Sequence, residues 1–331
     1  MWHISTVKSP PHLLINCYLS HHFTPVLTMS LSNNKFQLSN GNSIPAVAYG
    51  VGTKWFKFGR NELDANVVNA IKSALAKGFV HIDGAEIYNT NGEIGEAIAG
   101  LDRKNVFLTD KYFSGDSSHT RISPHGKPYD SLKHSLQNEL KVDYVDLYLL
   151  HAPFISKESH GFDLAEAWKS MEQAQKEGLT KNIGVSNFAV KDLEEILSVA
   201  EIKPVVNQIE FNAYLQNQTP GIVEFSQKNG ILVEAYSPLA PLVKGEKGEL
   251  TDYLDTLASK YNKLPSQILL RWVLERGVLP VTTSGNEERQ SQLVNIFDFS
   301  LTPEEVEKIN TLGEKHPTLR QYWTKEYSKY D

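Results

Sequence analysis

The chain alternates short strand-like segments with helix-like segments, and this alternation restricts its fold more than any other feature of the sequence. Eight short runs, such as residues 145–150 (VDLYLL), are rich in apolar and β-branched side chains, as buried strands are. The expected strands lie near residues 48–51, 80–83, 106–111, 145–150, 181–186, 205–210, 231–236 and 278–282. Helical spacing of apolar residues follows each run. The expected helices lie near residues 63–77, 93–99, 129–141, 164–177, 191–200, 221–229, 267–276 and 287–295.

Strands that alternate with helices over about 250 residues allow either a closed (β/α)8 barrel or an open doubly wound sheet. A dinucleotide-binding open sheet carries G-x-G-x-x-G between its first strand and first helix. Here Gly50 and Gly52 are followed by residues 53–56 (TKWF), which breaks that pattern. The sequence therefore predicts an α/β fold of the (β/α)8 TIM-barrel class, whose active site lies at the carboxyl ends of the strands.

Further elements are expected around this barrel. Asn-Gly at residues 40–41 stands between two short alternating runs and predicts an N-terminal β-hairpin. An extra helix is expected to begin at Thr302, with Glu305 completing a capping box. We also expect a C-terminal substrate loop and two long loops that shape a pocket at the catalytic face. The two long loops are residues 113–128 and 238–249.

The composition indicates a protein that acts on small molecules. The 331 residues include 33 basic and 39 acidic ones, and this mild net charge of −6 is typical of neither a nucleic-acid-binding nor a membrane-anchored protein. The one cysteine, Cys17, excludes an intramolecular disulfide framework and indicates a reducing compartment. We expect a cytoplasmic protein that is a monomer or weak dimer.

The first 30 residues differ in composition from the rest of the chain. They contain no acidic residue and two adjacent prolines, and they match neither a transit peptide nor a signal peptide. We expect residues 1–30 to be a disordered extension and residues 31–331 to form a single domain. Met29 lies directly before the globular pattern and is an alternative biological start.

Four polar residues lie at or just beyond the ends of three successive predicted strands: Asp83, Tyr88, Lys111 and His151. A tyrosine can act as a general acid, but its ordinary pKa near 10 means that it needs a neighbouring cation to donate its proton readily. Lys111 can supply that cation and lower the pKa of Tyr88, while Asp83 can keep the lysine charged. His151 can orient a carbonyl oxygen beside the hydroxyl.

Each of these residues also has a purely structural interpretation, and it is their clustering on one rim that indicates catalysis. Strand-end aspartates pair locally, and Tyr88 is one of 14 tyrosines. A different chemistry also fits the pattern, because Lys111 could form a Schiff base in an aldolase-like barrel. That chemistry needs a lowered lysine pKa, which pairing with Asp83 would prevent.

Several separated motifs resemble those of the aldo-keto reductases. In order along residues 32–330 they are GFVHIDGAEIYNTNGEIGEAI, LTDKYF, YVDLYLLHAP, KNIGVSNF, VNQIEFN and VEAYSPLAP. The segments LQNQTPGI and RWVLERGVLPVTTS, with Tyr322 and Trp323, are similar to the fungal branch of α-keto amide reductases and conjugated polyketone reductases. The resemblance implies a nicotinamide cofactor across the strand ends and hydride transfer to a carbonyl group that Tyr88 protonates.

The resemblance also implies catalytic and substrate roles. Lys111 and Asp83 become the pair that tunes Tyr88, and His151 becomes the group that orients the substrate. Candidate walls of the substrate pocket are Trp55, Phe113, Tyr322 and Trp323. Because these walls are apolar, we expect a planar or hydrophobic carbonyl substrate, such as an α-keto amide, an α-dicarbonyl, a conjugated polyketone or a ketolactone.

Motif matching further implies a set of cofactor contacts. Ser186, Asn187 and Gln208 would bind the nicotinamide carboxamide, which needs both a donor and an acceptor, and the Tyr236 ring would stack on the nicotinamide. The expected cofactor contacts are Gly52, Thr53, Asp83, Ser186, Asn187, Gln208, Tyr236, Ser237, Leu239, Thr283, Ser284 and Arg289. No metal ligand is expected.

The segment expected to meet the 2′-phosphate of NADPH departs from the common family pattern, because Thr283 stands where many relatives carry lysine. Arg289 can still pair with a phosphate, Ser284 can donate to it, and a following helix would offer its N-terminal N–H groups. Glu287 and Glu288 would repel a phosphate if they faced it. The sequence favours NADPH and leaves NADH as the alternative.

Two departures concern the substrate pocket. Gly84 stands where threonine is common and Ala152 where a bulky residue is common, and both changes are expected to enlarge the pocket. Two other functions remain open, a cofactor-sensing regulatory subunit of a potassium channel with the same fold and an NADH-preferring aldehyde reductase.

Overall fold

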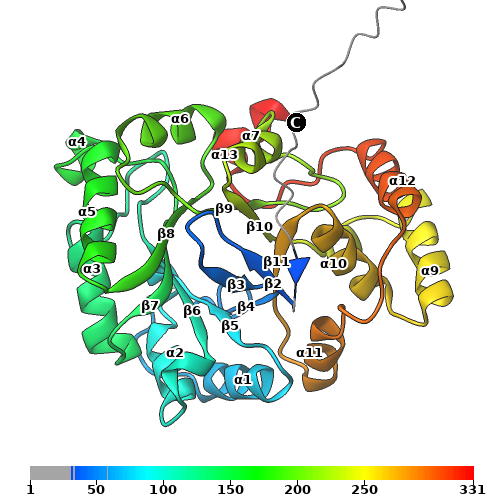
Figure 1. The fold of residues 1–331 in the computed structure, drawn as a ribbon, viewed down its shortest axis with the longest axis horizontal. Coiled ribbons are helices and arrows are strands. Elements are labelled where there is room, and N and C mark those ends of the chain that lie inside the picture. The colour runs from blue at the N-terminus through cyan, green and yellow to red at the C-terminus, as the bar shows by residue number, and fades with distance from the viewer. Residues whose placement is uncertain (1–30, 33, 58) are drawn as a thin grey trace, which may run out of the picture.

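Eight parallel strands close into a barrel, and helices surround it (Figure 1). The computed structural model describes residues 31–32, 34–57 and 59–331, so the predictions for residues 1–30, Cys17 and Met29 lie outside the described residues. The strand order around the barrel is β10-β11-β4-β5-β6-β7-β8-β9. The strands are β4 (Ala48–Gly50), β5 (His81–Asp83), β6 (Phe107–Tyr112), β7 (Val145–Leu150), β8 (Thr180–Ser186), β9 (Val206–Glu210), β10 (Leu232–Tyr236) and β11 (Val278–Thr282). The predicted (β/α)8 barrel and its eight strands are confirmed.

Helices follow the strands as the apolar spacing predicts. Those that match are α1 (Ala65–Ala76), α2 (Asn91–Ile98), α3 (Pro128–His134) with η3 (Ser135–Leu140), α5 (Leu164–Lys176), α6 (Val190–Val199), α7 (Ile222–Lys228), α10 (Pro265–Glu275) and α11 (Glu287–Val294). The extra helix α12 (Pro303–Glu314) begins after Thr302, which forms the predicted capping box with Glu305. Elements outside the predictions are η1 (Glu86–Tyr88), η2 (Arg103–Asn105), α4 (Lys157–His160), α8 (Ala240–Val243), α9 (Glu249–Tyr261), α13 (Thr324–Tyr327) and η4 (Ser328–Tyr330).

The helix predicted over residues 129–141 changes geometry part-way along. Its first half, α3, continues directly into the π-helix η3, whose last carbonyl groups meet α2. An ideal Cβ on Gly95 of α2 would lie 2.6 Å from Glu139 O and 2.7 Å from Leu140 O, which is too close for any side chain. This close approach holds α2, the helix that follows the η1 turn.

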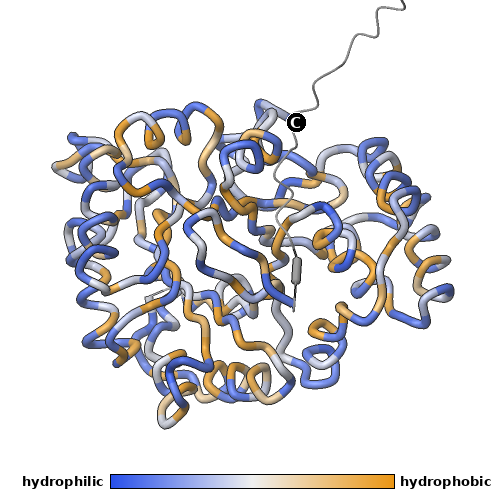
Figure 2. Tube along the Cα trace, viewed as in Figure 1, coloured by the Kyte–Doolittle hydropathy of each residue, from blue (hydrophilic) through white to orange (hydrophobic). Residues whose placement is uncertain are grey.

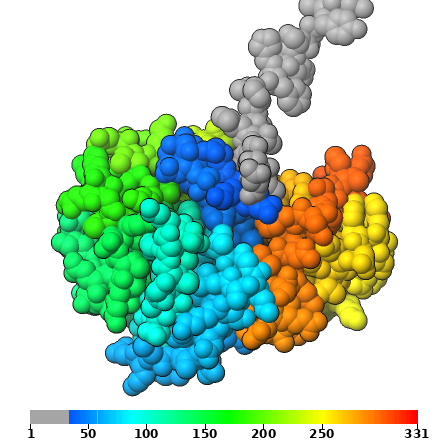
Figure 3. Space-filling view, turned by 60° about the horizontal axis from the view of Figure 1, so that its bottom comes forward, coloured from blue at the N-terminus to red at the C-terminus, as the bar shows by residue number. Residues whose placement is uncertain are grey.

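The predicted hairpin closes the amino-terminal end of the barrel. β2 (Lys35–Gln37) and β3 (Ser43–Pro45) pair antiparallel around the predicted turn, where Gly41 has a φ of 89°, and β1 (Leu31–Ser32) adds a third strand. Asn40 and Asn42 donate hydrogen bonds of 2.8 and 2.9 Å to Asn182 Oδ1, near the start of β8. In Figure 3 this first described part of the chain, in blue, lies between the green and orange parts of the ring. The carboxyl ends of the strands lie at the opposite end of the barrel.

The hydrophobic core fills the barrel and the layer between strands and helices. Leu149, Ile209 and Val233 are fully buried strand residues, and Figure 2 shows apolar strands inside helices that are polar on their outer faces. Burial of this apolar surface is the main stabilising contribution to a fold of this kind. None of the described helices combines the length and apolar character needed to span a membrane.

Candidate active site

The four predicted catalytic residues meet at the carboxyl ends of neighbouring strands. Asp83 ends β5, Lys111 lies on β6, His151 directly follows β7, and Tyr88 lies on the η1 turn. Lys111 Nζ is 2.6 Å from Asp83 Oδ1 and 5.2 Å from the centroid of the Tyr88 ring. Tyr88 Oη lies 3.4 Å from His151 Nε2. Hydroxyl, ammonium and imidazole therefore share one site.

Lys111 keeps its charge although it is fully buried. Burial lowers the pKa of its ammonium, but the negative charge of Asp83 and the neighbouring Tyr88 outweigh burial, and the net pKa is raised. The carbonyl oxygen of Gly84 accepts a further hydrogen bond from the ammonium at 2.8 Å. The raised pKa agrees with the role expected of Asp83 and is opposite to the lowered pKa that a Schiff-base lysine requires.

Burial also dominates the protonation of the other two groups. It raises the pKa of Tyr88, and the charge of Lys111 opposes this rise without cancelling it. Lys111 thus lowers the pKa of Tyr88 as predicted, but the net pKa in the free protein is raised, because burying a phenolate is more unfavourable than Lys111 is favourable. Burial, with a smaller effect from Lys111, lowers the pKa of His151 well below its usual range. The imidazole is thus neutral and has one N–H to donate.

The predicted carboxamide residues meet at the ends of β8, β9 and β10. Asn187 Nδ2 donates to His151 O at 2.9 Å and to Ser186 Oγ at 3.0 Å. Asn187 Oδ1 accepts from Tyr236 Oη at 2.8 Å and from Gln218 Nε2 at 3.2 Å. Every polar atom of this side chain already has a protein partner, so a cofactor contact by Asn187 would have to replace one of them.

Gln208 has a free acceptor where Asn187 has none. Its Nε2 donates to Asp83 Oδ2 at 2.9 Å and to Glu234 Oε2 at 2.6 Å. Both hydrogen bonds that this side chain makes within the described residues come from Nε2, which leaves Oε1 to accept from a ligand. Glu234 lies inside the motif VEAYSPLAP but was given no role there, although a charged residue inside a barrel strand is a sequence signal that could have indicated one.

The backbone turns sharply where two of these strands end. Asn187 after β8 has a φ of 62° and Ser237 after β10 has a φ of 56°, both in the left-handed region. Residues other than glycine adopt this region at a cost of about 1 kcal/mol or more, and such positions concentrate at functional sites. The left-handed turns let Asn187 and Ser237 stand over the strand ends.

Comparison with known proteins decides the family. Residues 48–314 match the model of the Aldo/keto reductase family. The chain belongs to the aldo/keto reductase family. The NADPH-dependent alpha-keto amide reductase of Saccharomyces cerevisiae is 50% identical, over 92% of this chain and 98% of its own length. The NAD/NADP-dependent indole-3-acetaldehyde reductase of Schizosaccharomyces pombe is 40% identical, over 83% of this chain and 94% of its own length.

A solved structure agrees with this assignment. The crystal structure of an aldo-keto reductase from Bombyx mori in complex with NADP has a TM-score of 0.73 and 34% identity, over 90% of this chain and 98% of that chain. The protein is therefore an enzyme of this family that reduces carbonyl groups with a nicotinamide cofactor. A channel-regulating subunit with the same fold is not favoured.

In the reductase, the predicted phosphate segment, residues 283–289, leads into the start of α11. The N–H groups at the start of a helix favour an anion. Trp55 Nε1 donates to Thr283 Oγ1 at 3.2 Å. An ideal Cβ on Gly285 would lie 2.7 Å from Lys54 Cε, so Lys54 lies against the segment and brings a cation to it. Trp55, predicted as a substrate wall, thus packs against Thr283 and Gly285 of the predicted phosphate segment. The motifs did not indicate Lys54, because it belongs to the distant loop after β4.

Each acidic residue of this segment interacts with a charged or polar side chain of the protein. Glu287 Oε2 lies 3.7 Å from Lys77 Nζ, and Glu288 Oε1 accepts from Gln292 Nε2 at 3.5 Å. Ser284 O accepts from Tyr49 Oη at 2.7 Å, which fixes the segment to β4. The phosphate segment is thus anchored from the barrel side.

The C-terminal segment, residues 315–331, lies across the barrel mouth of the reductase. Tyr322 Oη lies 3.2 Å from Thr53 Oγ1, and the Tyr322 ring is 5.7 Å from that of Tyr236. Glu210, at the end of β9, accepts from the backbone N–H groups of Gln321 at 2.8 Å and Tyr322 at 3.0 Å. The predicted substrate loop therefore spans from the loop after β4 to β10.

Aromatic residues near the mouth differ in their placement. The Trp323 ring lies 5.4 Å from that of Phe154, on the loop after β7. Phe56, rather than Trp55, packs near Tyr88, with the ring centroids 6.0 Å apart. Phe56 thus contributes an aromatic ring beside Tyr88 from the loop after β4.

Gly84 does not enlarge the substrate pocket, and that prediction is wrong. An ideal Cβ on Gly84 would lie 2.7 Å from Ile94 Cδ1 and 3.0 Å from Asn91 Oδ1, which both belong to α2. The position faces the helix layer because alternate residues at a strand end point to opposite sides. Ala152 is fully buried and its N–H donates to Ser114 Oγ at 3.3 Å, so it adds no open surface either.

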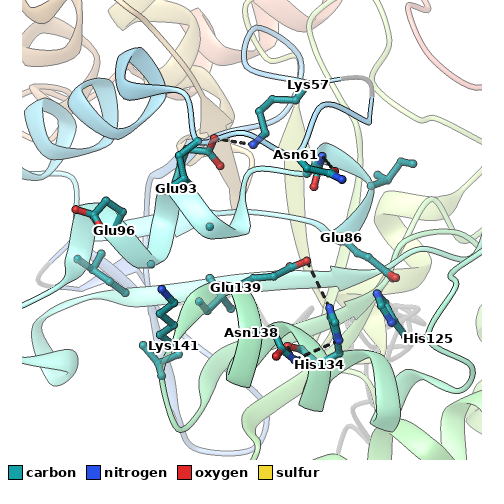
Figure 4. A pocket seen from close by; sticks show the side chains of 18 of the residues that line it. Lys57, Asn61, Glu86, Glu93, Glu96, His125, His134, Asn138, Glu139 and Lys141 are labelled. Atoms are coloured by element: carbon teal, nitrogen blue, oxygen red, sulfur yellow. Dashed lines mark hydrogen bonds and ion pairs between the residues drawn. The ribbon is translucent and has the colours of Figure 1, made fainter.

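A groove of about 1210 Å3 lies behind the wall that carries Tyr88, between α2, η3 and the loop after β6 (Figure 4). Burial raises the pKa of both Glu86 and Glu139, which line it, to about 7. Glu86 Oε2 accepts from the backbone N–H of Phe113 at 2.8 Å. Phe113, predicted as a wall of the substrate pocket, lines this groove.

Proposed function

We propose that this reductase uses NADPH to reduce the ketone of α-keto amides and related α-dicarbonyl compounds, at the site formed by Asp83, Tyr88, Lys111 and His151. The observation that carries the proposal is the buried Lys111 ammonium, paired with Asp83 and 5.2 Å from the Tyr88 ring, beside the neutral His151. The substrate class rests on the 50% identical yeast relative, which is named an alpha-keto amide reductase. Conjugated polyketones and ketolactones are further candidates.

Residues of the chain orient the substrate's carbonyl oxygen and supply the proton that it accepts. The neutral His151 donates its N–H to that oxygen and places it beside the Tyr88 hydroxyl. As negative charge develops on the oxygen, Tyr88 transfers its proton to it and becomes a phenolate. Lys111 stabilises the phenolate, and Asp83 keeps Lys111 charged. The bound nicotinamide supplies the hydride for the carbonyl carbon.

The donor set around the mouth fits a dinucleotide phosphate. Gln208 offers an acceptor oxygen to a carboxamide, and Tyr236 is proposed to stack on the nicotinamide ring. Gly52, Thr53, Ser237 and Leu239 are proposed along the pyrophosphate. Thr283, Ser284 and Arg289, together with Lys54, are proposed to hold the 2′-phosphate, because two cations and a helix N-terminus favour a dianion. NADPH is accordingly proposed as the preferred cofactor over NADH.

The location of the protein in the cell and its oligomeric state are two further proposals. A cytoplasmic location is proposed because the single cysteine suits a reducing compartment. A monomer or weak dimer is proposed, and sedimentation at several protein concentrations tests it.

Tyr88→Phe tests the proposed acid. Removing the hydroxyl should lower kcat for an aromatic α-keto amide by roughly 100-fold or more, because general-acid catalysis is worth about that factor. Binding of NADPH, followed by fluorescence, should stay within about twofold of the wild type. Tyr129→Phe is the control, since it removes a hydroxyl that donates to Glu177, away from the site. Near-normal reduction by Tyr88→Phe would show that the proton comes from another group.

Substrate comparison tests the proposed class. The kcat/KM for the α-keto amide should exceed that for xylose by at least about tenfold, because the aromatic mouth favours apolar substrates. Comparable values for the two would remove the substrate proposal and leave the acid assignment standing.

A further inference from the structure

Glu234 is a fully buried carboxyl inside the barrel that the proposed mechanism leaves unexplained. It lies on β10 directly opposite Gln208 of β9, and its Oε2 accepts from Gln208 Nε2 at 2.6 Å. Its Oε1 has no hydrogen-bond partner in the described part of the chain. A buried carboxyl is unfavourable unless it has a specific partner, so its single contact, with Gln208, is the feature to explain.

The second hydrogen of the same amide is also taken. Gln208 Nε2 donates to Asp83 Oδ2 at 2.9 Å, and the other oxygen of Asp83 is held by Lys111 at 2.6 Å. An amide nitrogen has two hydrogens, so both are used by these two carboxyl groups. Turning the amide by 180° would place its carbonyl oxygen against two acceptors, which is unfavourable. The hydrogen bonds to Asp83 and Glu234 therefore fix the orientation of the Gln208 amide.

We propose that Glu234 is a positioning residue that, together with Asp83, holds Gln208 so that only its carbonyl oxygen faces the cofactor. The site then selects a nicotinamide ring whose substituent carries an N–H donor and discriminates against one that has only acceptors. This rests on the proposed contact between Gln208 and the carboxamide. Asp83 alone holds one amide hydrogen, and Glu234 removes the remaining freedom to turn.

The charge state of Glu234 suits this role. Burial, followed by the negative charge of Asp83, raises its pKa to about 8, so at neutral pH the carboxyl is mostly protonated. With the proton on Oε1, Oε2 remains an acceptor for Gln208. Glu234 can thus fix the amide without adding a second negative charge beside the Asp83–Lys111 pair. Glutamine at this position would offer the same acceptor, whereas leucine or methionine would not.

Binding measurements with two cofactors test the proposal without catalysis. The probes are NADP+ and its 3-acetylpyridine analogue, whose acetyl group keeps the acceptor and lacks the N–H donor. Wild-type protein should bind NADP+ about tenfold more tightly, the factor expected for one hydrogen bond. In Glu234→Leu this ratio should fall at least about twofold, because Asp83 alone then opposes turning of the amide. Glu234→Gln should retain the wild-type ratio.

Adenosine 2′,5′-bisphosphate, which has no nicotinamide, is the control ligand. It should bind the wild type and all variants alike and so report a folded site. Glu234→Met, unbranched like glutamate, serves as a second apolar variant if Glu234→Leu fails this control. Retention of the wild-type ratio in a folded apolar variant, or its loss in Glu234→Gln, would overturn the role of Glu234. Gln208→Leu separates the two proposals, because a ratio unchanged in that variant would refute the Gln208 contact itself.

Discussion

At the scale of single residues, the buried carboxyl of Glu234 links the stability of the protein to pH. Burial raises its pKa to about 8 from an ordinary value of 4.5. Between these two values the folded state holds the proton more tightly than the unfolded state, so the free energy of unfolding falls as the pH rises through that window. We expect Glu234→Gln to be more stable than the wild type at about pH 9 and to differ little from it near pH 5. Urea unfolding at both pH values measures this difference.

An exposed glutamate provides the control for that prediction. The Glu249 side chain is 77% exposed, so Glu249→Gln should shift stability equally at both pH values. If Glu234→Gln shows no larger gain at high pH than Glu249→Gln, the titration belongs to another buried group, of which Glu86 and Glu210 are examples.

Lys54 is expected to contribute to the choice of cofactor. It lies against Gly285 at the proposed 2′-phosphate site, where Thr283 cannot supply a charge. Lys54→Met should weaken NADPH binding about fivefold and leave NADH binding unchanged, because only NADPH carries the extra phosphate. Fluorescence titration with both cofactors measures the ratio, and Lys72→Met, on the exposed face of α1, is the control. Equal weakening of both cofactors would place Lys54 at a group that they share.

Single-residue predictions from the sequence succeed where chain position alone determines geometry. Asp83, Lys111 and His151 were predictable because parallel strands end at one rim. The roles of Glu234 and Lys54 were not, because their contacts depend on how side chains meet inside the barrel and between loops, which the order of the strands does not determine. Asp83 and Gln208, for example, are 125 residues apart along the chain. The net pKa of Tyr88 also escaped prediction, because burial is a property of the folded state.

At the scale of elements, the contact between α2 and η3 can be tested with two glycines on one helix. An ideal Cβ on Gly95 would lie 2.6 Å from a backbone oxygen of η3, so Gly95→Ala should destabilise the protein by about 1–3 kcal/mol. On Gly92 it would meet only Leu63 Cδ2, at 3.1 Å. Leu63 is 57% exposed and can move, so Gly92→Ala should be neutral or stabilising by up to about 1 kcal/mol. Urea unfolding compares the two, and equal effects would contradict the backbone contact.

Element predictions fail where the local pattern does not contain the deciding information. The spacing of Leu132, Leu136 and Leu140 indicates a regular α-helix, yet the second half of that segment is a π-helix packed on α2. A π-helix has wider turns than an α-helix. This one accompanies the packing of the segment on α2, which the local spacing of apolar residues does not reveal. The helix α9 is different, because Leu250, Leu254 and Leu257 have helical spacing and are buried, so its pattern was present in the sequence.

At the scale of the whole molecule, the Glu210 carboxyl group is one of the contacts that hold the C-terminal segment over the mouth. Glu210 accepts from two backbone N–H groups, those of Gln321 and Tyr322. Glutamine has a single acceptor oxygen, so Glu210→Gln can hold only one of them. We expect hydrogen exchange at one of these amides to accelerate about tenfold. The Leu319 amide, which donates to Tyr214 O at 3.3 Å, should keep its rate. Unchanged exchange at both amides would contradict this role of Glu210.

The hairpin of β2 and β3 gives the molecule two unlike ends. Residues that hold the hairpin, such as Asn182, lie at the start of the strands, whereas every proposed catalytic group lies at or just beyond their carboxyl ends. A surface linker or fusion partner joined ahead of Leu31 would therefore leave from the end opposite the chemistry. An enzyme immobilised through that end would present its open mouth to the solution.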